Sequence, residues 1–118
     1  MLLNHLDLQS TDVQTLAAFF VDHFGFTRVT NNRSPAIAVL DGEGFSLVIQ
    51  RNDAPAYPDG FHLGFIQPSI ADVQAHHERL TNAGVTIGAI SSDNRGTRFY
   101  LRAPGEILIE ISTPTRSA

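Results

Sequence analysis

The chain contains no cysteine among its 118 residues. Disulfide bonds, thiolate metal sites and a cysteine nucleophile are therefore excluded. No apolar stretch approaches the roughly 20 residues that a membrane-spanning helix needs. The sequence also lacks a phosphate loop, a dinucleotide-binding fingerprint and a Gly-x-Ser-x-Gly motif.

The chain also has few basic residues and no cluster of like charges. The 8 basic residues are scattered, the formal net charge is -4, and no run of like charges exists, which argues against a nucleic-acid groove or an anionic membrane surface. The N-terminal residues have no basic region and reach Asp7 too early for a secretion signal. Apolar residues make up 42% of the chain and charged residues 17%, which is typical of a globular domain. We expect a soluble cytoplasmic protein with no nucleic-acid or membrane partner.

Hydrophobic periodicity predicts one helix and four strands in the first half. Residues 2–9 alternate between apolar and polar, which is typical of a half-buried strand. The turn at 10–12 offers helix-capping residues, and the helix that follows ends at Gly25. Further strands are predicted over residues 26–30, 36–40 and 45–50, the last two joined by a hairpin loop at 41–44.

The same order of elements restarts after residues 51–60. That stretch breaks all periodicity with two prolines and a glycine, so it is the best linker candidate. A strand at 62–66 is followed by a helix that starts at Pro68-Ser69 and ends at 82–84. The remaining predictions are strands at 85–89, 97–102 and 107–112, a polar loop at 91–96 and a frayed tail at 113–118.

The two halves also resemble each other residue by residue. His5-Leu-Asp-Leu matches His62-Leu-Gly-Phe, and Asp12-Val-Gln matches Asp72-Val-Gln. Such self-similarity indicates a duplicated supersecondary unit inside one domain. The predicted division of the single domain 1–118 is a first module at 1–52, a linker at 53–60 and a second module at 61–118.

Three segments, in order, carry a likeness to a known family. They are residues 4–8 (Asn-His-Leu-Asp-Leu), residues 71–85, and residues 98–111, which end in Ile-Leu-Ile-Glu-Ile. Together they resemble the vicinal-oxygen-chelate superfamily, the glyoxalase I, extradiol dioxygenase and bleomycin-resistance group, over nearly the whole chain. The resemblance implies an α+β fold in which two βαβββ modules form a curled mixed sheet around a central cavity, with the helices outside.

Two histidines and one glutamate are candidate metal ligands. His5 and His62 occupy matching positions in the first strand of each half, on the face opposite the leucines. Glu110 alternates with isoleucines in the last strand and lies on the face away from the helix. A strand histidine alone is ordinarily a packed or surface residue, so the inference depends on the set. The resemblance also implies that His5, His62 and Glu110 bind a divalent Fe, Mn, Ni, Co or Zn ion, although some family members bind no metal.

Glyoxalase I has a fourth ligand, a glutamate late in the first half. That position falls on Val48 or Ile49 here, and neither side chain can coordinate a metal. Gln50 has the same facing as Val48 but is displaced by one or two positions. The departure weakens a glyoxalase I assignment and leaves a three-ligand pattern that resembles the dioxygenase branch.

Other side chains are candidates for the cavity wall. Arg98, Tyr100 and Arg102 share one face of a predicted strand. If that face is concave, Tyr100 and an arginine would orient an anionic or phenolic substrate; otherwise they are rim residues. Asp7 and Gln9 share the face of His5 and are candidates to support the metal ligands. The other histidines (His23, His76 and His77) are predicted to be structural or exposed.

Two functions remain open. The first is a glyoxalase- or dioxygenase-like enzyme, a lyase, isomerase or dioxygenase, whose small-molecule substrate chelates the metal through vicinal oxygens, with Glu110 as the catalytic candidate. The alternative is a metal-free drug- or metabolite-binding protein of the bleomycin-resistance kind. The absence of tryptophan and the presence of only 2 tyrosines argue against an aromatic-lined groove, although 8 phenylalanines soften that objection.

A homodimer is expected, because each curled sheet would expose strand edges that a second copy can cover. The sequence leaves open whether the cavity forms within one chain or by exchange of modules across the dimer.

Overall fold

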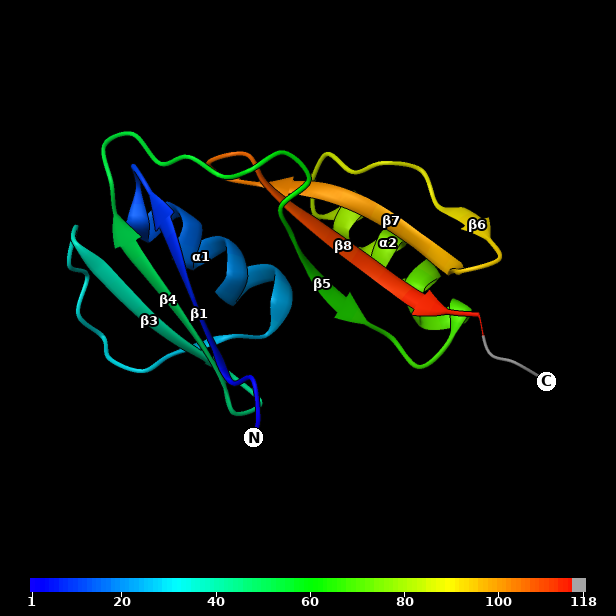
Figure 1. Cartoon of the computed structure of the whole chain (residues 1–118), viewed down its shortest axis with the longest axis horizontal. Helices are drawn as coiled ribbons and strands as arrows, with labels where there is room; N and C mark the ends of the chain where they lie inside the picture. Colours follow the sequence, from blue (N-terminus) through cyan, green and yellow to red (C-terminus); the bar gives the residue numbers. More distant parts are fainter. Residues whose placement is uncertain (116–118) are drawn as a thin grey trace. The chain divides into compact units, whose positions relative to one another are not determined.

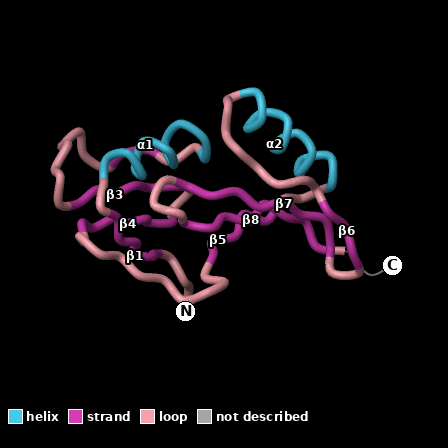
Figure 2. Tube along the Cα trace, turned by 90° about the horizontal axis from the view of Figure 1, so that it is seen from above, coloured by secondary structure: helices cyan, strands magenta, loops and turns pink. Residues whose placement is uncertain are grey.

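The computed structural model describes residues 1–115. The chain divides into two compact units, Met1–Tyr57 and Pro58–Ala118, and the division falls inside the stretch 53–60 that the sequence marks as a linker. Each unit contains one helix and one four-stranded sheet (Figure 1). In each unit the helix lies on one side of its own sheet (Figure 2).

The first unit is a βαβββ module with a mixed sheet. Its sheet has the order β1-β4-β3-β2, in which β1 runs parallel to β4 and the other neighbours are antiparallel. Its elements are β1 (His5–Ser10), α1 (Val13–Phe24), β2 (Thr27–Arg28), β3 (Ile37–Gly42) and β4 (Phe45–Arg51).

The second unit repeats that arrangement. Its sheet has the order β5-β8-β7-β6, with β5 parallel to β8 and antiparallel pairing elsewhere. Its elements are β5 (His62–Ile66), α2 (Ile70–Asn82), β6 (Ser91–Asp93), β7 (Gly96–Ala103) and β8 (Ile107–Pro114). The α+β class and the two βαβββ modules are therefore confirmed, whereas the central cavity and the exact module boundaries stay predictions.

Each helix forms where a capping residue precedes an apolar stripe. Asp12 accepts a hydrogen bond from the Thr15 amide at the start of α1, and Gly25 closes the helix at φ 73°. The stripe packs against one face of each sheet, and because strand side chains alternate between faces, every second residue of the central strands is buried there. The buried apolar residues are Leu8, Val13, Leu16, Ala17, Phe20, Phe26, Ala38, Leu40, Leu47 and Ile49 in the first unit, and Val73, Leu80, Phe99, Leu101, Ala103, Ile107, Ile109 and Ile111 in the second.

The matching Asp-Val-Gln triplets are not structurally equivalent. Asp12 is the N-cap of α1, but the N-cap of α2 is Ser69, and Asp72 lies one turn inside the helix. The Ser69 side chain accepts from the Asp72 amide and donates to its carboxylate. An alignment of the two modules on their Asp-Val-Gln triplets is therefore shifted by three positions relative to the alignment on the helix N-caps.

The predicted strand at 85–89 is wrong. Those residues contribute only an isolated bridge between Ile87 and Leu101, and the strand lies instead at Ser91–Asp93, within the predicted polar loop. A tight turn decides this pairing, because the Asp93 carboxylate accepts from the Arg95 amide and the chain reverses at Asn94 and Arg95, between the paired Asp93 and Gly96. The pattern of polar side chains carried no strand signal at this exposed edge.

Two strand lengths also differ from expectation. The predicted strand 26–30 is reduced to Thr27–Arg28. Phe26 itself packs its ring against Gly42, so closely that a Cβ added to Gly42 would lie 2.6 Å from a ring carbon of Phe26. The last strand continues to Pro114, and Thr113 is buried opposite Thr97, so the start of the tail is not frayed. Residues 116–118 of that tail lie outside the described residues. Among the described residues, no helix is long and apolar enough to cross a membrane.

Candidate functional site

The face of the second sheet that points away from α2 carries a polar row. Alternation in β8 buries Ile109 and Ile111 and leaves Glu110 on the opposite face, half-buried. The strand register places Gly64 of β5 and Tyr100 of β7 directly opposite Glu110, one on each side. The facing predicted for Glu110 is therefore confirmed.

The Glu110 carboxylate is held by two hydroxyl groups from its own sheet. Tyr100 donates to Oε1 at 2.6 Å, and Ser112 donates to Oε2 at 3.1 Å. Burial opposes ionisation of this carboxyl, but the two hydrogen bonds and the charges of His62 and Arg98 outweigh it, so the pKa of Glu110 lies below its ordinary value. The bond to this carboxylate in turn raises the pKa of Tyr100. Glu110 is therefore ionised at neutral pH, and Tyr100 keeps its proton.

His62 lies beside this pair with a defined tautomer. Its Nδ1 is 2.8 Å from the carbonyl oxygen of Gly60, and because a carbonyl only accepts, Nδ1 carries a hydrogen; in the neutral imidazole, Nε2 is then the nitrogen with the free lone pair. The imidazole ring meets the Tyr100 ring edge-on, with 6.1 Å between centroids. A Cβ at Gly64 would lie 3.9 Å from Glu110 Oε2, so the glycine leaves space beside the carboxylate.

Both arginines of the same face are paired. Arg98 donates from Nη1 and Nη2 to Asp93 at 3.1 and 2.8 Å, and Arg102 donates to the Glu106 carbonyl at 2.9 Å. The bonds between Arg98 and Asp93 hold the pKa of the Asp93 carboxyl well below its usual range and raise that of the guanidinium. As predicted, Arg98, Tyr100 and Arg102 share one face, opposite the buried Phe99 and Leu101.

In the first unit, His5 occupies the position equivalent to His62. It is exposed on the face away from α1, and its Nδ1 is 2.9 Å from the side-chain oxygen of Asn4, an acceptor, so that Nδ1 carries a hydrogen here as well. Because His5 pairs with Ser46 as His62 pairs with Leu108, Val48 takes the position of Glu110. Gln50 is exposed two residues further along the same face, opposite Ile37 and Gln9.

The structure brings together three of the predicted site residues, His62, Tyr100 and Glu110, with Arg98 close by. His5 and Gln50 belong to the first unit. Within either unit, residues 1–115 hold no group of three or more His, Asp or Glu side chains that would bind a metal by themselves. The three-ligand set therefore stays a prediction.

Sequence reasoning missed Ser112, Gly64 and Asp93. Ser112 has the same strand parity as Glu110, which could have indicated a shared face, whereas the contacts of Asp93 depend on a turn that the sequence pattern did not reveal. The other histidines make structural contacts, as expected: His77 donates from Nε2 to the Gly88 carbonyl and packs on Phe99, for example.

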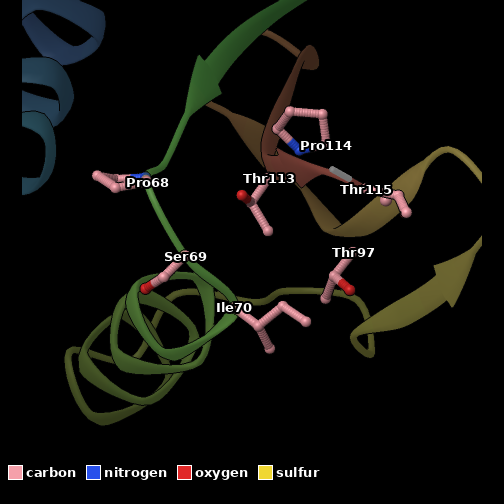
Figure 3. A pocket seen from close by; sticks show the side chains of 8 residues that line it. Pro68, Ser69, Ile70, Thr97, Thr113, Pro114 and Thr115 are labelled. Carbon is pink, nitrogen blue, oxygen red and sulfur yellow. The ribbon is translucent and has the colours of Figure 1, made fainter. Parts of the chain in front are cut away.

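A pocket of about 290 Å³ lies elsewhere in the second unit, at the start of α2 (Figure 3). Its polar wall includes Thr97 and Thr113, which lie on the helix-covered side of the sheet, opposite in parity to Tyr100 and Glu110. None of the predicted site residues lines it. The full lining is Pro68, Ser69, Ile70, Gly96, Thr97, Thr113, Pro114 and Thr115.

The chain is similar in sequence and in structure to proteins of one superfamily. The Glyoxalase/Bleomycin resistance protein/Dioxygenase superfamily matches residues 2–111. A solved structure of a possible glyoxalase from Bacillus cereus is 33% identical, with a TM-score of 0.81 over 95% of this chain and 98% of that chain. No curated protein matches the chain.

Two more distant structures share the fold alone. A lactoylglutathione lyase from Agrobacterium tumefaciens is 18% identical, with a TM-score of 0.79 over 95% of this chain and 92% of that chain. A fosfomycin resistance protein from Listeria monocytogenes is 20% identical, with a TM-score of 0.81 over 98% of this chain and 94% of that chain. The extent of the family match, together with the paired βαβββ modules, shows that the chain belongs to the Glyoxalase/Bleomycin resistance protein/Dioxygenase superfamily.

Proposed function

We propose that the chain is a metal-dependent enzyme that acts on a small molecule bearing two vicinal oxygens. The observation that supports this most directly is the ionised Glu110 carboxylate, held by Tyr100 and Ser112 on the open face of the second sheet. His62 shares that face and donates from Nδ1 to Gly60, so that Nε2 is the nitrogen of the neutral imidazole that would bind a metal. A carboxylate and an imidazole prepared in this way are ligands that a divalent cation prefers.

The side chains fit a divalent metal chemically. The proposed ligands are His5, His62 and Glu110, a set that suits Fe, Mn, Ni, Co or Zn. A metal-binding histidine usually donates its other ring N–H to an oxygen acceptor. His62 does so to Gly60, and His5 does so to Asn4.

The bound metal would act as a Lewis acid toward substrate oxygens that gain negative charge. Glu110 is the proposed catalytic residue, because an ionised carboxylate can also accept a proton from substrate. Tyr100 is 37% exposed beside it and is proposed to contact the substrate. Gln50 is proposed to line the cavity. Arg98, whose guanidinium already donates to Asp93, would contribute positive potential.

The reaction class is a lyase, isomerase or dioxygenase reaction. Relatives described as a possible glyoxalase, a lactoylglutathione lyase and a fosfomycin resistance protein support chemistry on small molecules. We also propose a homodimer located in the cytoplasm.

Metal analysis tests the proposal. Purified protein is dialysed against Fe(II), Mn, Ni, Co or Zn in turn, and about one ion per chain is expected to remain. Glu110→Ala should abolish binding, whereas Glu78→Ala, which removes an exposed carboxylate from α2, should leave it unchanged. A substrate screen with the retained metal then follows. If no ion is retained stoichiometrically, the enzyme proposal fails, and the metal-free binding protein becomes the better explanation.

A further inference from the structure

Arg98 lies between two carboxylates of the second unit. On β7 its direct cross-strand partners are Ser91 of β6 and Ser112 of β8. Glu110 is two residues from Ser112 on the same face, which makes it the diagonal neighbour of Arg98. Diagonal Cβ atoms in a sheet are about 7–8 Å apart, a separation that a long side chain can span. Asp93 lies on the other side, on β6.

The guanidinium pairs with the outer carboxylate. Its two terminal nitrogens donate to both oxygens of Asp93, at 3.1 and 2.8 Å, and the arginine side chain is only 12% exposed. A two-point bond of this kind fixes the orientation of the planar guanidinium as well as its position. Arg98 is therefore held toward β6, while Glu110 takes its hydrogen bonds from Tyr100 and Ser112.

Asp93 is also held by two contacts that do not involve Arg98. Its Oδ1 accepts from the Arg95 amide at 2.8 Å within the turn between β6 and β7. Its carbonyl oxygen accepts from the Thr115 hydroxyl at 3.3 Å. Because the turn fixes the carboxylate, the arginine adapts to Asp93 and not the reverse.

Without the Asp93 charge, the guanidinium would be attracted to Glu110, its diagonal neighbour on the same face. An arginine on Glu110 would occupy the oxygen lone pairs that a cation needs, and it would add a positive charge at the same place. We propose that Asp93 is a positioning residue that holds Arg98 away from Glu110 and so keeps the Glu110 carboxylate open to a divalent cation. The consequence for the cation rests on the proposed metal centre, whereas the choice of ion-pair partner does not.

The test uses Asp93→Asn, which keeps the turn acceptor and removes the charge. Asp53→Asn is the matched control, because Asp53 forms an ion pair with Arg51 in the first unit. Crystal structures of both variants without metal are compared, and Zn²⁺ binding by the whole protein is measured by calorimetry. In Asp93→Asn the guanidinium should lie within about 4 Å of a Glu110 oxygen, and Zn²⁺ affinity should fall at least roughly tenfold. The double variant Asp93→Asn/Arg98→Met should regain the affinity of the unmodified protein.

Each outcome supports or overturns the proposed role of Asp93. If the guanidinium stays at position 93 or turns to solvent, the inference is overturned. It is overturned as well if Arg98 moves to Glu110 without loss of Zn²⁺ affinity, or if the double variant is as weak as the single one. Should the unmodified protein bind no Zn²⁺ or other metal, the proposed function fails, and the position of Arg98 in the single variant still supports or refutes the exchange of ion-pair partner.

Discussion

Tyr100 and Glu110 constrain each other through a single short hydrogen bond. The phenol donates to the carboxylate at 2.6 Å, which favours the ionised acid and the protonated phenol together. The position equivalent to Glu110 in the first unit is Val48, and the position equivalent to Tyr100 is Val39. The duplicated modules have thus diverged along this row: the carboxylate belongs to Glu110 of β8 in the second unit and to Asp7 of β1 in the first.

The first prediction concerns Tyr100→Phe. Because burial raises the pKa of Glu110 and the Tyr100 hydrogen bond lowers it, loss of that bond should move the pKa upward, toward its ordinary value. A carboxyl with a lowered pKa stabilises the fold above its unfolded-state pKa, and this contribution is lost as pH falls through the folded-state pKa. The variant should therefore be less stable than the unmodified protein at pH 7 and close to it in acid.

The measurement is an NMR titration of the Glu110 side-chain carbon, together with urea unfolding at two pH values. Tyr57→Phe is the control, because the Tyr57 hydroxyl bonds to the Gln9 backbone of the first unit. An unchanged Glu110 titration in Tyr100→Phe would show that the hydrogen bond has no electrostatic effect.

At the scale of elements, alternation in β8 separates the core from the site. Ile109 is fully buried under α2, whereas its neighbour Glu110 is half-buried on the face of the sheet that points away from α2. The faces of the strand can be assigned from the sequence, because Ile107, Ile109 and Ile111 alternate with Leu108, Glu110 and Ser112. The face of every candidate residue on β1, β5, β7 and β8 could therefore be predicted.

The second prediction contrasts two neighbouring substitutions. Ile109→Asp should unfold the second unit, because a buried unpaired carboxylate costs roughly 3–5 kcal/mol, a large share of the stability of a small domain. Glu110→Ala should leave a folded protein. Circular dichroism and thermal unfolding of both variants check this. Equal loss of structure in the two proteins would show that the assigned faces are wrong.

Other elements were beyond the reach of sequence patterns. Residues 85–89 alternate well enough to suggest a strand, yet Gly88 instead donates to the Tyr100 carbonyl and accepts from His77. The true edge strand, Ser91–Asp93, is exposed and has no apolar alternation. Its pairing depends on the turn at Asp93, and the same turn places the carboxylate that Arg98 binds. The turn therefore determines both the position of β6 and that of the Asp93 carboxylate, and hydrophobic periodicity does not encode such a turn.

At the scale of the whole molecule, each sheet has two edge strands, each of which pairs with one other strand within residues 1–115. The edge strands are β1 and β2 in the first unit and β5 and β6 in the second. At the β1 edge, the Tyr57 hydroxyl bonds to both the amide and the carbonyl of Gln9. On β5, Ile66 is 75% exposed. Strand edges and exposed apolar side chains of this kind favour association with a second copy.

The sequence supplies candidate ligands, and their binding of a metal stays a prediction. Strand parity and duplication identified His5, His62 and Glu110 as candidates, because each is a polar side chain on the face opposite the core. If the predicted site combines a first and a second module, no local sequence pattern encodes whether the two modules come from one chain or from two.

The third prediction is therefore a homodimer, tested by mixing variants. Light scattering should give twice the chain mass at micromolar concentration; a monomer would refute the dimer. His5→Ala and Glu110→Ala proteins are then combined by co-refolding, and retained metal is measured. If His5 and Glu110 of different chains bind one ion, half of the chains should sit in mixed dimers that regain one intact site. If each site is built within one chain, every site in the mixture lacks a ligand and no metal returns. Either result fixes which chains contribute to the site, because the ligand set is the same in both arrangements and only its source differs.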